Sequence, residues 1–234
     1  KLITSLQQKK YRKQEQLFFA EGVKVVQELL NSNFELQDLF TTKQDFLTVS
    51  KDKVHAISEA ELKKISALTT PNTCLAVFKM PKSKDFVEKG LMVALDDVRD
   101  PGNLGTIIRL CDWFGIETLF CSEESVDIYN PKVVQATMGS ISRVNVVYGN
   151  LEAFLTKTKL PVFGTFMDGK NIYQEKLPKE GIIIMGNEAN GISSSVEKLV
   201  SERIAIPRFG NLQVTESLNV ATATAIILSE FKRS

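Results

Sequence analysis

The pattern of hydrophobic positions changes near residue 90. From there on, short continuous apolar runs alternate with helical stretches. The runs are Leu91–Leu95, Thr118–Cys121, Val144–Val147, Val162–Thr165, Ile182–Met185 and Ile204–Ile206. Strands that are apolar on both faces are typical of a parallel sheet covered by helices. We therefore predict an α/β domain with a parallel sheet, followed by a largely apolar C-terminal helix at about Ser217–Phe231.

The first eighty residues show shorter apolar groups in a more polar background. Apolar residues at roughly helical spacing from Leu17 to Leu30 predict one or two amphipathic helices at the start of the chain. Ser58–Ile65 begins with a capping box, because Glu61 stands three residues after Ser58. The predicted strands are Leu39–Phe40, Leu47–Val49 and Cys74–Phe78.

A proline among charged residues in Met80–Lys84 marks a domain boundary. The prediction is a small α/β domain at residues 1–82 and a larger α/β domain at residues 86–234.

The composition fits two ordinary globular domains. The 234 residues are 43% hydrophobic and 24% charged, and no apolar run approaches the ~18 residues that a membrane-spanning helix needs. Three cysteines without paired spacing and a single histidine, His55, indicate neither a disulfide framework nor a metal site. We therefore expect a cytoplasmic protein that binds no metal.

The charge is distributed unevenly along the chain. Residues 1–85 contain 14 Lys or Arg and 10 Asp or Glu, so the basic excess lies there although the whole chain carries only +1. The basic residues cluster at Lys9, Lys10, Arg12 and Lys13. Such a cluster can bind RNA phosphates without sequence preference, or it can be a solvated helix face. Any RNA contact in the first domain is expected at this cluster.

Three polar segments that contain glycine or proline follow predicted strands, where ligands bind in open α/β sheets. Neither of the two common glycine-rich nucleotide loops is present. The segments read DPGNLGTIIR at Asp100–Arg109, GNEANGIS at Gly186–Ser193, and IP followed by SLNVA at Ile206–Pro207 and Ser217–Ala221. The chemistry of this chain is therefore predicted to lie in these three segments of the second domain.

In order and spacing these segments resemble the three motifs of the SpoU or TrmH family of RNA ribose methyltransferases, within the SPOUT class. The resemblance covers residues 90–234. The start of the chain resembles, more weakly, the ribosomal-protein-like RNA-binding domain that precedes many of these enzymes. The resemblance implies a trefoil knot in the parallel-sheet domain, S-adenosylmethionine as cofactor, and a homodimer with its active site at the interface.

The implied activity is methyl transfer to a ribose 2′-hydroxyl of structured RNA, with ribosomal RNA favoured over transfer RNA. Two alternatives remain open at this point. One is a SPOUT methyltransferase that modifies a base, although the SLN sequence of the third motif favours the ribose. The other is a non-catalytic RNA-binding protein or ribosome assembly factor with the same fold.

The resemblance also implies roles for individual residues. Those expected to contact S-adenosylmethionine are Thr165, Gly186, Gly191, Ile206 and Leu218. Those expected in the reacting site are Asn103, Arg109, Glu188, Ser217 and Asn219. Arg208–Glu216 is longer than the usual family spacing, so no cofactor contact is transferred to it. A guanidinium has a pKa above ~12 and resists deprotonation, so we expect Arg109 to hold a phosphate and orient the hydroxyl, and the proton acceptor stays open.

Overall fold

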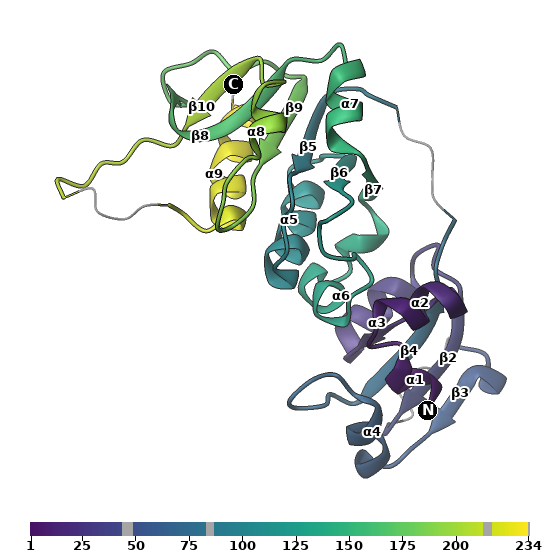
Figure 1. The fold of residues 1–234 in the computed structure, drawn as a ribbon. Helices are drawn as coiled ribbons and strands as arrows, with labels where there is room; N and C mark the ends of the chain where they lie inside the picture. The colour runs from purple at the N-terminus through teal and green to yellow at the C-terminus, as the bar shows by residue number, and fades with distance from the viewer. Residues whose placement is uncertain (44–48, 83–86, 213–216, 234) are drawn as a thin grey trace. The chain divides into compact units, whose positions relative to one another are not determined.

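The computed structural model describes residues 1–43, 49–82, 87–212 and 217–233. The chain forms two compact units (Figure 1), one made of Lys1–Ser83 with Asp127–Ser142 and the other of Lys84–Val126 with Arg143–Ser234. The segment 127–142, which the sequence interpretation included in the second domain, thus packs with the first unit. The functional division into an RNA-binding and a methyltransferase domain stays a prediction.

The first unit is built on a four-stranded sheet in the order β1-β4-β2-β3. β1 and β2 pair antiparallel with β4, and β3 pairs parallel with β2. The strands are β1 (Leu17–Glu21), β2 (Leu36–Thr41), β3 (Val54–Ala56) and β4 (Cys74–Lys79). The helices are α1 (Leu2–Ser5), α2 (Lys9–Glu15), α3 (Val23–Leu30), α4 (Glu59–Ile65) and α6 (Pro131–Thr137), with 3-10 turns η1 (Lys51–Lys53) and η2 (Ser140–Ser142).

Helices α2 and α3 lie where one or two amphipathic helices are predicted, but the helical spacing predicted from Leu17 is wrong for Leu17–Glu21, which is strand β1. Gln16 adopts a left-handed conformation with a φ of 55°, which ends α2. All five residues of β1 are buried, as a strand covered on both faces requires. The helical spacing resumes only in α3, after Gly22.

Other local predictions for this unit are confirmed. The capping box of α4 is formed, with Ser58 Oγ accepting from Glu61 N and Glu61 Oε2 accepting from Ser58 N at 2.8 Å. The predicted strands at residues 39–40 and 74–78 lie within β2 and β4. The strand predicted at Leu47–Val49 lies largely outside the described residues.

The second unit contains a six-stranded sheet in the order β10-β8-β9-β5-β6-β7, and all its strand pairs are parallel. The strands are β5 (Leu91–Leu95), β6 (Thr118–Ser122), β7 (Asn145–Gly149), β8 (Val162–Asn171), β9 (Gly181–Met185) and β10 (Glu202–Ala205). The chain runs outward from β5 to β7 and then fills the other side of the sheet. The predicted α/β domain with a parallel sheet is confirmed.

The helices of this unit are α5 (Pro101–Trp113), α7 (Leu151–Lys157), α8 (Ser194–Glu197) and α9 (Val220–Arg233). α9 begins at Val220 rather than at Ser217, because Asn219 Oδ1 accepts from the backbone N–H groups of Ala221 and Thr222 and so caps the helix. Phe231 packs edge-on against Phe163 of β8 with ring centres 5.2 Å apart. α9 therefore buries much of its apolar surface within its own unit.

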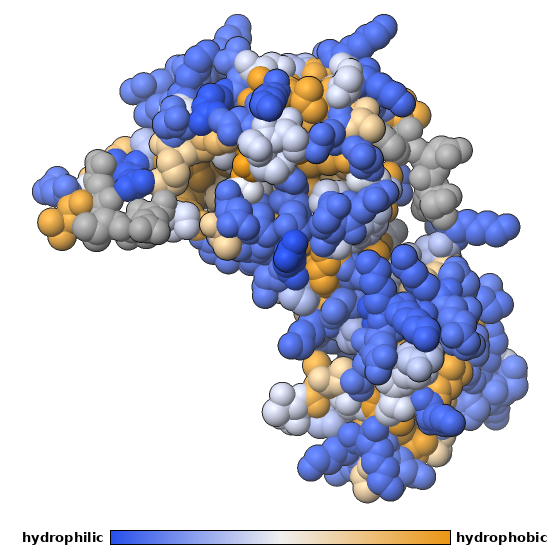
Figure 2. Space-filling view, viewed as in Figure 1, coloured by the Kyte–Doolittle hydropathy of each residue, from blue (hydrophilic) through white to orange (hydrophobic). Residues whose placement is uncertain are grey.

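The face drawn in Figure 2 is mostly hydrophilic, with smaller hydrophobic patches between the polar side chains. In the part of the chain that the structure describes, no helix is both long enough and apolar enough to cross a membrane.

Candidate active site

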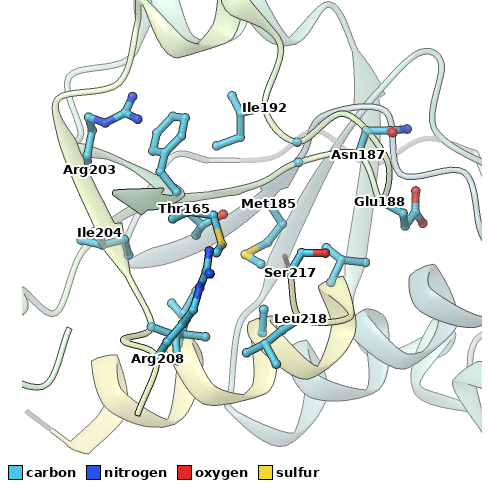
Figure 3. A pocket seen from close by; sticks show the side chains of 18 of the residues that line it. Thr165, Met185, Asn187, Glu188, Ile192, Arg203, Ile204, Arg208, Ser217 and Leu218 are labelled. Carbon is cyan, nitrogen blue, oxygen red and sulfur yellow. The ribbon is translucent and has the colours of Figure 1, made fainter. Parts of the chain in front are cut away.

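A cavity of about 1110 Å³ lies in the second unit, between β8, β9, β10 and the start of α9. Figure 3 shows Leu218 close to the start of α9, with Thr165 and Met185 lining the same space. All five residues expected to contact the cofactor line this cavity: Thr165, Gly186, Gly191, Ile206 and Leu218. Two of the residues expected in the reacting site, Glu188 and Ser217, line it as well. The structure thus brings segments of the second and third motifs to one space.

The loop after β9 folds tightly on itself and presents its backbone to the cavity. Asn187 and Gly191 exchange two backbone hydrogen bonds, both of 2.9 Å. A Cβ atom at Gly186 would lie 2.3 Å from the carbonyl carbon of Gly191, so any larger residue would push these two segments apart. Gly191 itself has a φ of +69°, where glycine is favoured. These two glycines therefore fix the shape of the cavity wall.

Glu188 joins the second motif to the first. Its Oε1 accepts from the backbone N–H of Asp100 and from Asn103 Nδ2, both at 3.0 Å, and its Oε2 accepts from the backbone N–H of Arg99 at 3.2 Å. Asn219 of the third motif donates through Nδ2 to Asn103 Oδ1 at 2.8 Å. One chain of hydrogen bonds therefore connects all three motifs beside the cavity. Asn103 and Asn219 are not lining residues, but Glu188, to which this chain of hydrogen bonds leads, is one.

The protonation of Glu188 follows from these contacts. Burial raises the pKa of the carboxyl group, but hydrogen bonds from the Asn103 side chain and from backbone N–H groups, including those of Asp100 and Arg99, hold the pKa below its ordinary value. A carboxylate with a lowered pKa is a weak base. Glu188 is therefore better suited to hold N–H groups in place than to take a proton from a hydroxyl.

Arg109 is not brought to the cavity of its own chain. Its side chain is exposed, and within the described residues it makes no hydrogen bond or ion pair and does not line the cavity. It follows Asn103 by six positions on α5, a rise of about 9 Å along the helix. Within one chain, the structure therefore does not bring Arg109 to the hydrogen bonds of Asn103 and Glu188, with which it is expected to share the reacting site.

The four residues of the basic cluster in the first unit lie on α2, but they do not all face solvent. Lys9, Lys10 and Lys13 are exposed on α2, whereas Arg12 is buried. Arg12 donates to the carbonyl groups of Leu6 and Gln7 and forms an ion pair of 2.6 Å with Asp127. The guanidinium is thus bound inside the first unit, so Arg12 is removed from the set of residues predicted to contact RNA.

Sequence reasoning did not find every lining residue. Phe166 of β8 and Arg203 of β10 both line the cavity, and Arg203 Cζ lies 3.6 Å from the centre of the Phe166 ring. The one feature of the sequence that could have pointed to Phe166 is its position directly after Thr165, which is a predicted cofactor contact. Among the residues that the structure describes, no group of three or more His, Cys, Asp or Glu side chains could hold a metal ion.

Comparison with known proteins identifies the family. Residues 90–229 match the model of the SpoU rRNA Methylase family, and residues 1–76 match the model of the MRM3-like substrate binding domain. The first match covers more than half of the chain. The protein therefore belongs to the SpoU rRNA methylase family, and the family prediction based on the three motifs is confirmed.

Individual relatives agree with this assignment. The 23S rRNA (guanosine(2553)-2′-O)-methyltransferase RlmP of Bacillus subtilis (strain 168) is 29% identical over 95% of this chain and 91% of its own. A solved structure from Porphyromonas gingivalis, described as an RNA methyltransferase of the TrmH family, is 39% identical with a TM-score of 0.88, covering 99% of this chain and 96% of its own. An rRNA methyltransferase from Sinorhizobium meliloti, solved with bound AdoMet, is 29% identical with a TM-score of 0.87, covering 99% and 93%.

Proposed function

We propose that this protein methylates a ribose 2′-hydroxyl of ribosomal RNA in the cytoplasm. It is an RNA methyltransferase, and S-adenosylmethionine is its methyl donor. The choice of the ribose and of ribosomal RNA is supported by the Bacillus subtilis relative, which is named as a 2′-O-methyltransferase of 23S rRNA. The trefoil knot and the homodimer that the family resemblance implies are part of this proposal.

The single observation that carries the proposal is that the cavity adjoins the hydrogen bonds that link Glu188 to Asn103 and Asn103 to Asn219. On one side, Met185, Ile206 and Leu218 offer apolar surface suited to a flat adenine ring. On the other, the folded loop at residues 186–191 offers backbone C=O groups suited to the N–H and O–H donors of a nucleoside, whereas the N–H groups of residues 187 and 189–191 are bonded within the loop. When bound there, S-adenosylmethionine would supply an electrophilic methyl group next to the polar side chains of the three motifs.

Positioning is the main task left to the protein. Methyl transfer is an in-line displacement, so much of the rate can come from alignment of the ribose oxygen with the methyl carbon. Asn103, Ser217 and Asn219 are neutral groups able to hydrogen-bond a ribose. Glu188 holds Asn103 and the first turn of α5 in place. The proton acceptor is left open.

Arg109 is proposed to act in the active site of a second copy of the chain. The exposed part of α5 supports a homodimer, because Trp113 is 84% exposed and stands four residues after Arg109, on the same side of the helix. The apolar character of α9 supports a homodimer less well, since α9 is largely covered within its own unit. Arg109 would grip an RNA phosphate through its planar pair of donors and orient the hydroxyl.

Transfer of labelled methyl groups tests the reaction. RNA from cells that lack this protein is incubated with the purified enzyme and labelled S-adenosylmethionine, and the product is then hydrolysed in alkali. A 2′-O-methyl group blocks alkaline cleavage at its nucleotide, so we expect label from ribosomal RNA in alkali-resistant dinucleotides. Label in mononucleotides would indicate methylation of a base, and label in transfer RNA alone would refute the ribosomal substrate. Cofactor binding without transfer to any RNA would indicate the non-catalytic alternative.

Subunit mixing tests the role of Arg109. Arg109→Ala and Asn103→Ala are each expected to lower methyl transfer about 100-fold, the scale expected when a positioning group is removed. If Arg109 serves the partner's cavity, a mixture of the two variants regains activity, because each mixed dimer contains one complete site. No recovery after proven subunit exchange would place Arg109 in its own chain's site. Arg109→Lys keeps the charge and should keep part of the activity, with cofactor affinity unchanged.

A further inference from the structure

The wall of the cavity contains an irregular part of β8. Along β10, Arg203 pairs with Gly164 and the next residue, Ile204, pairs with Lys170. Residues 165–169 of β8, here called the β8 excursion, are therefore passed over in a single step of β10. Its residues Thr165, Phe166 and Met167 line the cavity. A Cβ atom at Gly169 would lie 2.4 Å from the carbonyl carbon of Ile204, so glycine is needed where the excursion returns to β10.

One side chain of β10 contacts the β8 excursion at two points. The guanidinium of Arg203 lies over the ring of Phe166, with Cζ 3.6 Å from the ring centre, and donates to Asp168 Oδ1 at 2.5 Å. Its other terminal nitrogen donates to Glu197 of α8. Figure 3 shows Arg203 at the edge of the cavity, near Ile204. Arg203 thus connects the excursion, β10 and α8 through a single planar group.

The contacts of Arg203 affect the position of the cavity wall more than the free energy of unfolding. Arg203 is 38% exposed and its partners Asp168 and Glu197 are 74% and 44% exposed, and ion pairs at such positions contribute little to unfolding free energy. The two carboxylates also neutralise the guanidinium, which leaves it a poor binder of a further anion. What remains is the stacking on Phe166, which fixes the orientation of a ring in the cavity wall.

We infer that Arg203 is a positioning residue of the cofactor site, which holds the β8 excursion so that Phe166 and Met167 form the wall against which S-adenosylmethionine binds. The inference rests on the proposed function in taking this cavity as the cofactor site. Lysine cannot replace the arginine fully, because a compact ammonium cannot lie flat on a ring and bridge two carboxylates at once.

Three variants of the full-length protein test the inference by calorimetric titration with S-adenosylmethionine and by thermal melting. Arg203→Met keeps an unbranched stem in place of the guanidinium-bearing side chain and removes the charge, and it should weaken binding about fivefold to tenfold, the scale of one cation–π interaction together with its charge-assisted hydrogen bonds. Arg203→Lys should lie between Arg203→Met and the parent. Lys170→Met is the matched control, because it breaks the 2.8 Å ion pair of Lys170 with Glu202 between the same two strands and outside the lining.

A double-mutant cycle separates positioning from general stability. If Arg203 acts through the ring, Arg203→Met should have no further effect on affinity once Phe166 has been replaced by alanine. The inference is overturned if Arg203→Met binds as tightly as the parent, or if Lys170→Met weakens binding equally. It is also overturned if the effects of Arg203→Met and Phe166→Ala simply add. A parent protein that fails to bind S-adenosylmethionine would overturn the cofactor site as well, whereas unaffected variants of a binding parent overturn this inference alone.

Discussion

Replacing Glu188 by glutamine tests whether one carboxylate holds the three motifs in register. The carboxylate accepts from the backbone N–H groups of Arg99 and Asp100 and from the side-chain amide of Asn103. Glutamine has nearly the same shape but replaces one acceptor oxygen with an NH₂ donor. In either orientation of the amide, this donor faces at least one N–H group. At least one of the three hydrogen bonds is therefore broken.

The size of the effect follows from the contacts. A hydrogen bond to a charged group contributes ~1.5–3 kcal/mol, and the exposure of Glu188 reduces this. We expect Glu188→Gln to lower the free energy of unfolding of the second unit by about 1–2 kcal/mol. For a protein of this size, that change lowers the melting temperature by roughly 2–8 °C. Methyl transfer should fall by about tenfold or more, since a broken hydrogen bond at Glu188 lets the first motif shift relative to the second.

The pH dependence gives a second check. The folded-state pKa of Glu188 lies below its ordinary value of 4.5, so the carboxylate stays ionised in the folded protein at pH values where the unfolded chain already binds a proton. Its stabilising contribution is therefore complete above that ordinary value and is lost as the pH falls through the lower, folded-state pKa. The difference in stability between parent and Glu188→Gln should be constant near pH 7 and shrink below pH ~4.5.

Urea unfolding at a series of pH values measures this difference. The control is Glu180→Gln, since Glu180 is an exposed carboxylate before β9 that makes no hydrogen bond or ion pair in the described part of the chain. The control should behave as the parent at every pH. If Glu188→Gln matches the parent in both stability and methyl transfer, the carboxylate does not hold the motifs, and our interpretation of the hydrogen bonds is wrong.

Further predictions concern the first unit and the thiols. Arg12→Met leaves the carboxylate of Asp127 without its ion pair and should lower the unfolding free energy by about 3 kcal/mol in urea, with cofactor affinity unchanged; equal stability would refute a structural role for the pair. Burial raises the pKa of Cys74 to about 12 and raises those of the other two thiols, so a thiol reagent at pH 8 should react only after denaturation, and prompt labelling of the native protein would contradict the burial. The three exposed lysines of α2 are Lys9, Lys10 and Lys13. Replacing all three by glutamine should reduce the slope of the logarithm of RNA affinity against the logarithm of salt concentration by ~0.7–0.9 for each phosphate that the protein no longer neutralises. An unchanged slope would mean that these lysines form a solvated helix face that does not contact RNA.

The sequence allowed much of the fold of the second unit to be predicted. Each of its strands contains a short apolar run, and β5, β6 and β9 are buried at every position, as strands covered on both faces require. β1 could not be recognised in the same way, because Leu17–Ala20 precedes apolar residues of α3 that continue a helical spacing. Gln16, at the end of α2, and Gly22, between β1 and α3, both have positive φ and separate β1 from the helices on either side. That conformation leaves no clear mark in the hydrophobic pattern.

Some residues of the candidate site could likewise be predicted from the sequence, and others could not. Residues such as Gly186 and Glu188 could be proposed because they directly follow a strand and belong to a motif. The burial of Arg12 could not be foreseen, since its partner Asp127 lies 115 residues away in the chain. Arg203 was missed because its position in the cavity depends on the β8 excursion, and a register shift between two strands is a property of their pairing rather than of either sequence.

The contrast between Glu188 and Arg109 bears on how the active site is assembled. The two oxygens of Glu188 are engaged by groups of its own unit, so its task is complete within one chain. Arg109 lies on the same helix as Asn103, yet within the described residues its guanidinium has no acceptor and the cavity is lined without it. A side chain that has five donors and no partner in its own chain is suited to an acceptor supplied from outside, such as an RNA phosphate. The first turn of α5 is thus bonded to Glu188 at the cavity of its own chain. In the proposed dimer, the exposed later part of α5 is where a second copy would have to dock to bring Arg109 into a site.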